Sequence, residues 1–211
     1  MHIKKIYNIL FFILILALYS GHTWSFTSVS RDFNELVTLA DTIIIGTVTK
    51  QESKWDDPIA QDFIHTEITL DDTETLKGHN NLNPYILTIA GGVIPPYVLS
   101  IPGAPSFSAN QRYILFIKDN NKVVFPLVGI HDGIFIVEES ENGTTSVKTI
   151  DGQFITTIDQ DEVITQSTTS KGLTPPKSIS LQSFKQQITH RLQKSEPALI
   201  ESSLTPSSDN E

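Results

Sequence analysis

The sequence contains no cysteine, few basic residues and no long apolar run. Without cysteine the chain forms no disulfide, has no reactive thiol and carries no lipid on a lipobox cysteine. Its 24 acidic residues outnumber its 15 lysines and arginines, so the formal net charge is −9. Nucleic acids and anionic membrane surfaces repel a chain this acidic. We therefore expect neither of them as a partner.

The longest apolar run covers residues 9–18 and lies near the N-terminus. A helix that crosses a bilayer needs roughly 20 apolar residues, so this run is too short. Lys4 and Lys5 precede it, and small or polar residues follow it up to Ser25. This order is typical of a secretory signal peptide. Residues 1–25 are therefore predicted to direct export, either to the periplasm or to the extracellular medium.

Signal peptidase favours small residues at the −3 and −1 positions, which Thr23 and Ser25 supply. We predict cleavage after Ser25, which makes Phe26 the new N-terminus. Cleavage after Ser20 or Gly21 is one alternative, and an uncleaved N-terminal anchor is another. Removal of the signal leaves 186 residues with a net charge of −11, which is enough for one domain. After cleavage we expect no stable membrane insertion.

The apolar pattern after the signal predicts a short helix and then a series of short strands. Ser30 is placed as the N-cap of a helix over residues 31–40. Residues 43–49 are continuous and mostly β-branched, which indicates a strand buried on both faces. Further strands are predicted over residues 64–70, 85–90, 112–117, 123–128, 134–137, 146–150 and 154–158. Short strands with a turn signal about every ten residues predict a small antiparallel barrel or sandwich.

One strand carries a break in its alternation. Ile64, Thr66, Ile68 and Leu70 occupy the alternate, inward positions, and the same register then reaches Asp72 and Glu74. Acidic residues at positions expected to be apolar indicate a β-bulge that re-aims the strand.

The composition changes after residue 158. Residues 159–177 are rich in Thr, Ser, Gln and Pro, which predicts a linker behind a β-barrel domain of residues 26–158. Ser180 then caps a predicted helix over residues 178–195, with an apolar face formed by Leu181, Phe184, Ile188 and Leu192. Residues 196–211 are polar and are predicted to be a disordered tail.

A set of short motifs spans residues 26–140. The motifs are Glu-Leu-Val at 35–37, Ala-Asp-Thr-Ile-Ile-Ile-Gly-Thr-Val-Thr at 40–49, Glu-Ser-Lys-Trp at 52–55, Leu-Lys-Gly at 76–78, Gly-Gly at 91–92, Pro-Gly-Ala-Pro-x-Phe at 102–107, and Arg-Tyr-x-Leu-Phe at 112–116. As a set they resemble a family of exported bacterial proteins of unknown activity.

The order of these motifs is also similar, more distantly, to the netrin-like modules of tissue metalloproteinase inhibitors. That resemblance implies an OB-like five-stranded β-barrel flanked by helices, and an exported protein, such as a protease, as partner. Those inhibitors reach a catalytic zinc with an N-terminal cysteine, which this chain lacks. Inhibition by that mechanism does not carry over, and neither resemblance brings catalytic residues.

Histidines and carboxylates are the candidates for catalysis or metal binding in the part of the chain that follows the signal. None of the histidines has the spacing of a metal-binding motif. The acidic pair Asp71 and Asp72 does not stand in the residue pattern of a calcium-binding loop. No serine stands in a nucleophile motif, and no phosphate or dinucleotide loop is present. We therefore predict no catalytic residue, no metal site and no cofactor.

The long segment 91–107 is the predicted binding face. It is rich in proline and apolar residues, although a solvent-exposed loop requires neither. The candidate residues are Ile94, Pro95, Pro96, Tyr97, Leu99 and Phe107. Fixed prolines reduce the entropy that a surface loses on binding. The alternative is that these side chains only cover the open end of the barrel.

The prediction is thus a non-catalytic module that binds another exported protein, and two other functions remain open. A metal-dependent hydrolase requires three or more members of one set to meet in a pocket. That set is His65, Glu67, Asp71, Asp72, His79 and His131. A binder of carbohydrate or cell-envelope material requires Trp55 and Tyr97 to lie as exposed stacking platforms over a groove.

Overall fold

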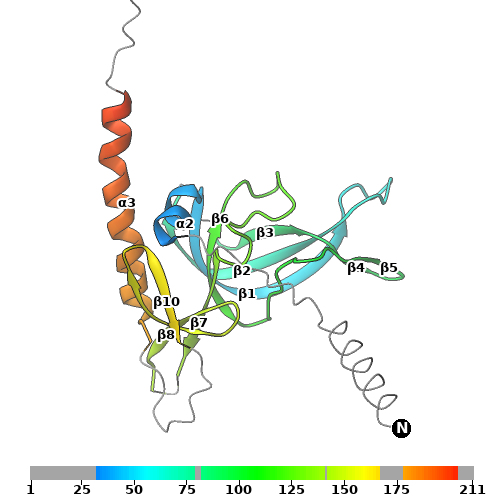
Figure 1. Cartoon of the computed structure of the whole chain (residues 1–211). Helices are drawn as coiled ribbons and strands as arrows, with labels where there is room; N and C mark the ends of the chain where they lie inside the picture. The colour runs from blue at the N-terminus through cyan, green and yellow to red at the C-terminus, as the bar shows by residue number, and fades with distance from the viewer. Residues whose placement is uncertain (1–31, 79–81, 141, 167–177, 204–211) are drawn as a thin grey trace, which may run out of the picture. The chain divides into compact units, whose positions relative to one another are not determined.

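The computed structural model describes residues 32–78, 82–140, 142–166 and 178–203, and the predicted signal peptide lies outside these residues. The described chain is mainly β and antiparallel, with a short helix near the N-terminus and a longer one near the C-terminus (Figure 1). The helices are α2 (Phe33–Leu39) and α3 (Leu181–Ser203). The strands are β1 (Thr42–Trp55), β2 (Ile64–Lys77), β3 (Tyr85–Ala90), β4 (Gly92–Ile94), β5 (Tyr97–Leu99), β6 (Arg112–Ile117), β7 (Ile134–Glu139), β8 (Thr145–Thr149), β9 (Phe154–Asp159) and β10 (Glu162–Gln166).

Eight of these strands form one sheet in the order β10-β9-β8-β7-β6-β1-β2-β3, and β4 and β5 form a separate hairpin. The mainly-β class, the antiparallel pairing and the two flanking helices are as predicted. The sheet is not closed, because its edge strands β10 and β3 do not pair with each other. The predicted barrel is therefore an open sheet in this molecule.

The β-branched run at the start of β1 explains why this strand lies at the centre of the fold. Ile43 and Ile45 pack into an apolar cluster with α2 and α3, and Ile44 packs into a second cluster on the opposite face. All three side chains are fully buried. A strand that is buried on both faces must be apolar at consecutive positions, as this sequence is.

The predicted bulge is present. The pairing of β1 with β2 shifts between Ile45↔Glu74 and Thr47↔Asp71, and Asp72 has a φ of 50°. Gly46 lies opposite, where an added Cβ would stand 3.0 Å from the Cβ of Leu70. The bulge lets the 14 residues of β2 follow the curved β1 while Asp72 points away from the core.

Two predicted segments differ near the C-terminus. Residues 162–166, placed in the linker, form strand β10, because Gln160 and Asp161 turn the chain with φ values of 46° and 69° and without a glycine. Residues 167–177 of that linker lie outside the described part. Helix α3 continues to Ser203 and so extends into residues predicted as a disordered tail.

The N-caps of the two helices and the strand over residues 123–128 were also predicted. Asp32 caps α2, accepting a hydrogen bond from the backbone N–H of Glu35 at 2.5 Å, and the predicted cap Ser30 lies outside the described residues. Ser180 caps α3 as predicted, with its Oγ 3.1 Å from the N of Ser183. Residues 123–128 do not form the predicted strand and make only a single bridge, between Leu127 and Ile117.

Candidate functional site

The predicted binding segment folds into the β4–β5 hairpin, which projects from the end of β3 (Figure 1). Its strands pair Val93 with Val98 and Ile94 with Tyr97. The turn between them is the dipeptide Pro95-Pro96, joined by a cis peptide bond. Proline has a fixed φ and no N–H, which suits it to this turn and prevents longer pairing.

The base of the hairpin is bonded to strands β1 and β2. The backbone N–H of Gly91 donates to the carbonyl of Ile64 at 2.8 Å, and the Thr66 hydroxyl donates to the carbonyl of Gly91 at 2.7 Å. Gly92 has a φ of 147°, and a Cβ there would lie 2.3 Å from the Ser53 Oγ. Only glycine fits at this position, so the position of the hairpin is fixed by close backbone contact with the sheet.

Three large apolar side chains are exposed on this hairpin. Val93, Tyr97 and Val98 are 57%, 55% and 67% exposed. The rings of Tyr97 and Trp55 meet edge to face, with centroids 5.4 Å apart. Val93 and Val98 are direct cross-strand partners, so their side chains lie on one face of the hairpin.

The structure divides the six predicted face residues into three groups. Pro95, Pro96 and Tyr97 are exposed, and Ile94 and Leu99 are half-buried. Phe107 does not lie on this face, because its side chain is buried in the core beside Tyr113, with ring centroids 5.1 Å apart. Its position in the sequence, two residues after a proline in a loop, gave no sign of this long-range contact.

Val93 and Val98 were not among the residues that the sequence predicted for this face. Strand pairing between residues five apart was the missing information, since it brings these two side chains onto one surface. The short runs of β-branched and aromatic residues on each side of Pro95-Pro96 were the signal that could have predicted a hairpin.

A groove of about 370 Å³ lies at the root of the hairpin. The residues that line it include Gln51, Ile89, Leu99, Ile101, Pro105 and Phe107. The Gln51 side-chain amide donates to the carbonyl of Phe107 at 3.0 Å, which ties the returning segment to β1. The groove has room for a side chain of a partner but carries few groups for acid–base chemistry.

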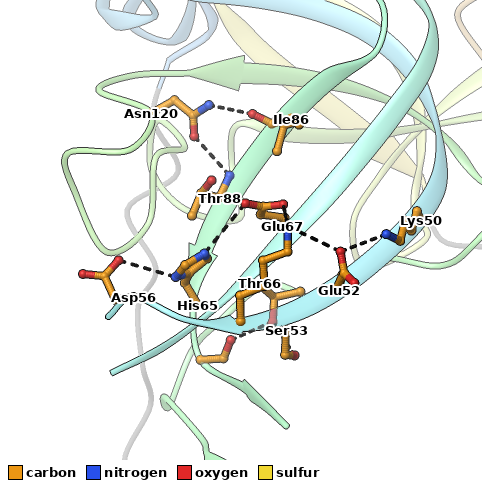
Figure 2. Close-up of polar contacts among 12 residues, drawn as sticks. Lys50, Glu52, Ser53, Asp56, His65, Thr66, Glu67, Ile86, Thr88 and Asn120 are labelled. Atoms are coloured by element: carbon orange, nitrogen blue, oxygen red, sulfur yellow. Dashed lines mark hydrogen bonds and ion pairs between the residues drawn. The ribbon is translucent and has the colours of Figure 1, made fainter. Parts of the chain in front are cut away.

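Strands β1 and β2 bear a ladder of ion pairs beside the hairpin (Figure 2). Lys50 lies 2.8 Å from Glu52, and Lys54 lies 2.5 Å from Glu67 and 3.4 Å from Glu52. The hydrogen bond from Lys50, followed by that from Lys54, lowers the pKa of Glu52. The hydrogen bond to Glu67 raises the pKa of Lys54. Glu52 and Lys54 are therefore favoured in their charged forms, and the two acidic and two basic side chains compensate one another's charge.

The candidate catalytic and metal residues do not meet in one pocket. His65 lies near Glu67, but Asp71 is held by the hydroxyl of Thr49 at 2.6 Å, further along β2. Asp72 is at the bulge, His131 is in a turn before β7, and His79 lies outside the described residues. Among the described residues, no group of three or more His, Asp or Glu is arranged to hold a metal ion.

Comparison with known proteins adds no functional assignment. No protein-family model matches the chain, and no curated protein matches it. In the part of the chain that the structure describes, no helix is long and apolar enough to cross a membrane. The function must therefore be inferred from the geometry of the hairpin and of the strands that hold it.

Proposed function

We propose that this chain is an exported, non-catalytic binding module that docks another exported protein through the β4–β5 hairpin. The observation that carries the proposal is the cross-strand pair Val93 and Val98, exposed in the middle of a hairpin that is bonded to the sheet at its base. Burying one such side chain on a partner contributes roughly 1.5–3 kcal/mol. A monomer gains nothing by leaving these side chains in water.

The anchoring of the hairpin supports the same proposal. Val93 is tied to strand β1, because its backbone N–H donates to the Ser53 Oγ at 3.1 Å. A surface that is already ordered loses little conformational entropy when it binds. The proline turn and the glycine contact at the base therefore favour recognition by a preformed surface. A protease as partner, and the periplasm or extracellular medium as location, are parts of this proposal suggested by the resemblance and the signal sequence.

A carbohydrate or cell-envelope ligand is the second candidate, because one observation favours it. Trp55 and Tyr97 do lie together, and Tyr97 is half exposed beside the groove. Aromatic rings supply stacking surface for sugars when one ring face is open. The edge-to-face contact uses part of this surface, so the valine pair makes a protein partner the better fit.

The test is binding by the chain that begins at Phe26, compared with its Val93→Asp/Val98→Asp variant. We expect the parent to retain a protein from an exported-protein fraction, and the variant to bind that purified protein at least about tenfold more weakly. Both positions are exposed, so circular dichroism and the urea midpoint should match those of the parent.

Ile164→Asp is the matched control, because Ile164 is an exposed strand residue on the opposite edge strand, β10. It should bind like the parent.

Gly92→Ala is a second variant, which displaces the hairpin while its exposed side chains are kept, and it should weaken binding. Equal binding by the parent and the valine variant would contradict the proposal, and retention of envelope polysaccharide in place of protein would favour the second candidate.

A further inference from the structure

His65 occupies a place in β2 from which it can influence the hairpin. Its neighbours in the strand, Ile64 and Thr66, hold both backbone groups of Gly91. Its own partner across the β2–β3 ladder is Ala90, the last residue before the hairpin segment. The side chain of His65 is only 15% exposed. Its environment therefore lies directly against the base of the candidate binding face.

Each ring nitrogen of His65 faces a carboxylate (Figure 2). The Nδ1 atom lies 3.5 Å from an Asp56 oxygen, and the Nε2 atom lies 3.9 Å from a Glu67 oxygen. Nδ1 is buried and makes no hydrogen bond. A buried polar nitrogen without a hydrogen bond requires an explanation, because desolvating it without compensation costs free energy.

The number of protons on the imidazole supplies that explanation. A neutral imidazole carries one N–H and one lone pair, so it can donate to only one of two carboxylates while its lone pair faces the other. The imidazolium form carries two N–H groups and a positive charge, so each ring nitrogen attracts the carboxylate that it faces at these ion-pair distances. The arrangement of Asp56, His65 and Glu67 is thus complementary to the protonated ring.

We propose that His65 is a proton-operated latch that holds the Asp56 carboxylate, at the start of the loop between β1 and β2, against strand β2. Protonation strengthens both contacts, and loss of the proton leaves one carboxylate against a lone pair. Imidazole side chains ordinarily change charge between pH 5 and 8. The latch is therefore closed at the acidic end of this range and opens as the pH rises.

The other charged groups around His65 are paired with carboxylates other than Asp56. Lys54 on β1 binds the second oxygen of Glu67, and Lys122 from the loop 119–124 lines the same pocket of about 210 Å³. Lys122 is 3.8 Å from Asp119, with which it forms an ion pair. Within the described residues, the Asp56 carboxylate forms an ion pair with no group other than His65. The backbone N–H of Asp56 donates to the carbonyl of Phe63 at 2.8 Å, so the charge of the ring affects the position of the carboxylate and not that of the backbone.

The latch extends to the hairpin through Trp55. Asp56 directly follows Trp55, whose ring meets Tyr97 on β5. Trp55 stays paired with Ile64 in the β1–β2 ladder in both states. A closed latch restrains the Asp56 side chain beside the Trp55–Tyr97 contact, and an open latch leaves that side chain free to move there. The consequence for a partner, namely pH-dependent binding by the hairpin, depends on the proposed function, whereas the latch itself does not.

Trp55 fluorescence in the full chain tests the latch without any partner. The chain has two tryptophans, so a Trp24→Phe background leaves Trp55 as the single emitter. Between pH 8 and pH 5 we expect a one-proton transition in its emission. Over the same range, the hydrogen-exchange protection factors of Gly91 and Val93 should rise about two- to fivefold, the range of a partly exposed ion pair.

His65→Gln and Asp56→Asn should each abolish the transition, and Asp56 is exposed enough to be replaced without loss of the fold. His131→Gln, which changes an exposed histidine in a turn, should keep it. A transition that persists in Asp56→Asn, or a parent whose Trp55 emission and exchange do not change with pH, would overturn the latch. Either result would leave the valine-pair test of the proposed function unaffected.

Discussion

Asn120 shows how one side chain protects the edge of a sheet. Its amide donates to the carbonyl of Ile86 at 2.8 Å and accepts from the N–H of Thr88 at 3.1 Å (Figure 2). These two groups lie on the outer edge of β3, the last strand of the sheet. The adjacent residues Asp119 and Asn121 both have positive φ, at 54° and 65°. The loop is thus held in an uncommon backbone conformation, and the amide occupies the place of a further strand.

Replacement of Asn120 should therefore destabilise the protein. Asn120→Ala leaves the Ile86 carbonyl and the Thr88 N–H without this partner, and we expect the free energy of unfolding in urea to fall by about 1–3 kcal/mol. In Asn120→Asp the carboxylate can accept from Thr88 but cannot donate to Ile86. Relative to the parent at each pH, this variant should regain part of its stability below about pH 4, where a protonated carboxyl again carries a donor.

Lys122→Ala is the control in the same loop. Its side chain is 76% exposed and its ion pair with Asp119 is long, at 3.8 Å, so the change in stability should stay within about 0.5 kcal/mol. Equal unfolding free energies for Asn120→Ala and the parent would show that water replaces the amide at no cost.

Among the secondary-structure elements, α3 is part of the core and not an appendage. Phe184 is fully buried, with its ring 5.2 Å from Phe33 of α2 and 5.0 Å from Phe135 of β7. Two turns further on, Arg191 binds Asp161 at 2.7 Å and lies over the ring of Phe33. The helix therefore covers one face of the sheet together with α2.

Removing the central ring of this interface should have a large effect. Phe184→Ala deletes a fully buried aromatic side chain, and we expect a loss of about 3–5 kcal/mol in urea unfolding. Phe184→Leu fills more of the space and should lose clearly less. Gln186→Ala, on the exposed side of the same helix, should be close to neutral. A small loss for Phe184→Ala would show that α3 can leave the sheet without cost to the core.

For the molecule as a whole, export is the proposal that determines which partners it can meet. The expected result in a secreting bacterial host is a product that begins at Phe26, found outside the cytoplasm and identified by intact mass and N-terminal sequencing. Ser25→Arg places a large cation at the −1 position and should block or move this cleavage. An unprocessed N-terminus in the parent would favour the anchor, and a start after residue 20 or 21 would correct the site.

The strands that could be predicted from sequence are those that carry their own pattern. The β-branched run of β1, the alternation in β2 and the apolar residues of β6 each mark a strand locally. Residues 123–128 have a similar composition but form no such strand, because Pro126 interrupts the pairing and Asn120 already holds the neighbouring edge of β3. Strand β10 was missed because its turn contains no glycine.

The sequence by itself determined the mainly-β class, the two helices and the bulge in β2, because these depend on patterns within a few residues. It also marked the segment that carries the proposed binding face. Only the tertiary structure decided that the sheet stays open, that Phe107 is buried, and that Val93 and Val98 share one surface. It also brought His65 between two carboxylates that lie 9 residues before it and 2 residues after it. Such contacts depend on which strands pair and in what register, and composition does not encode register when the residues are far apart.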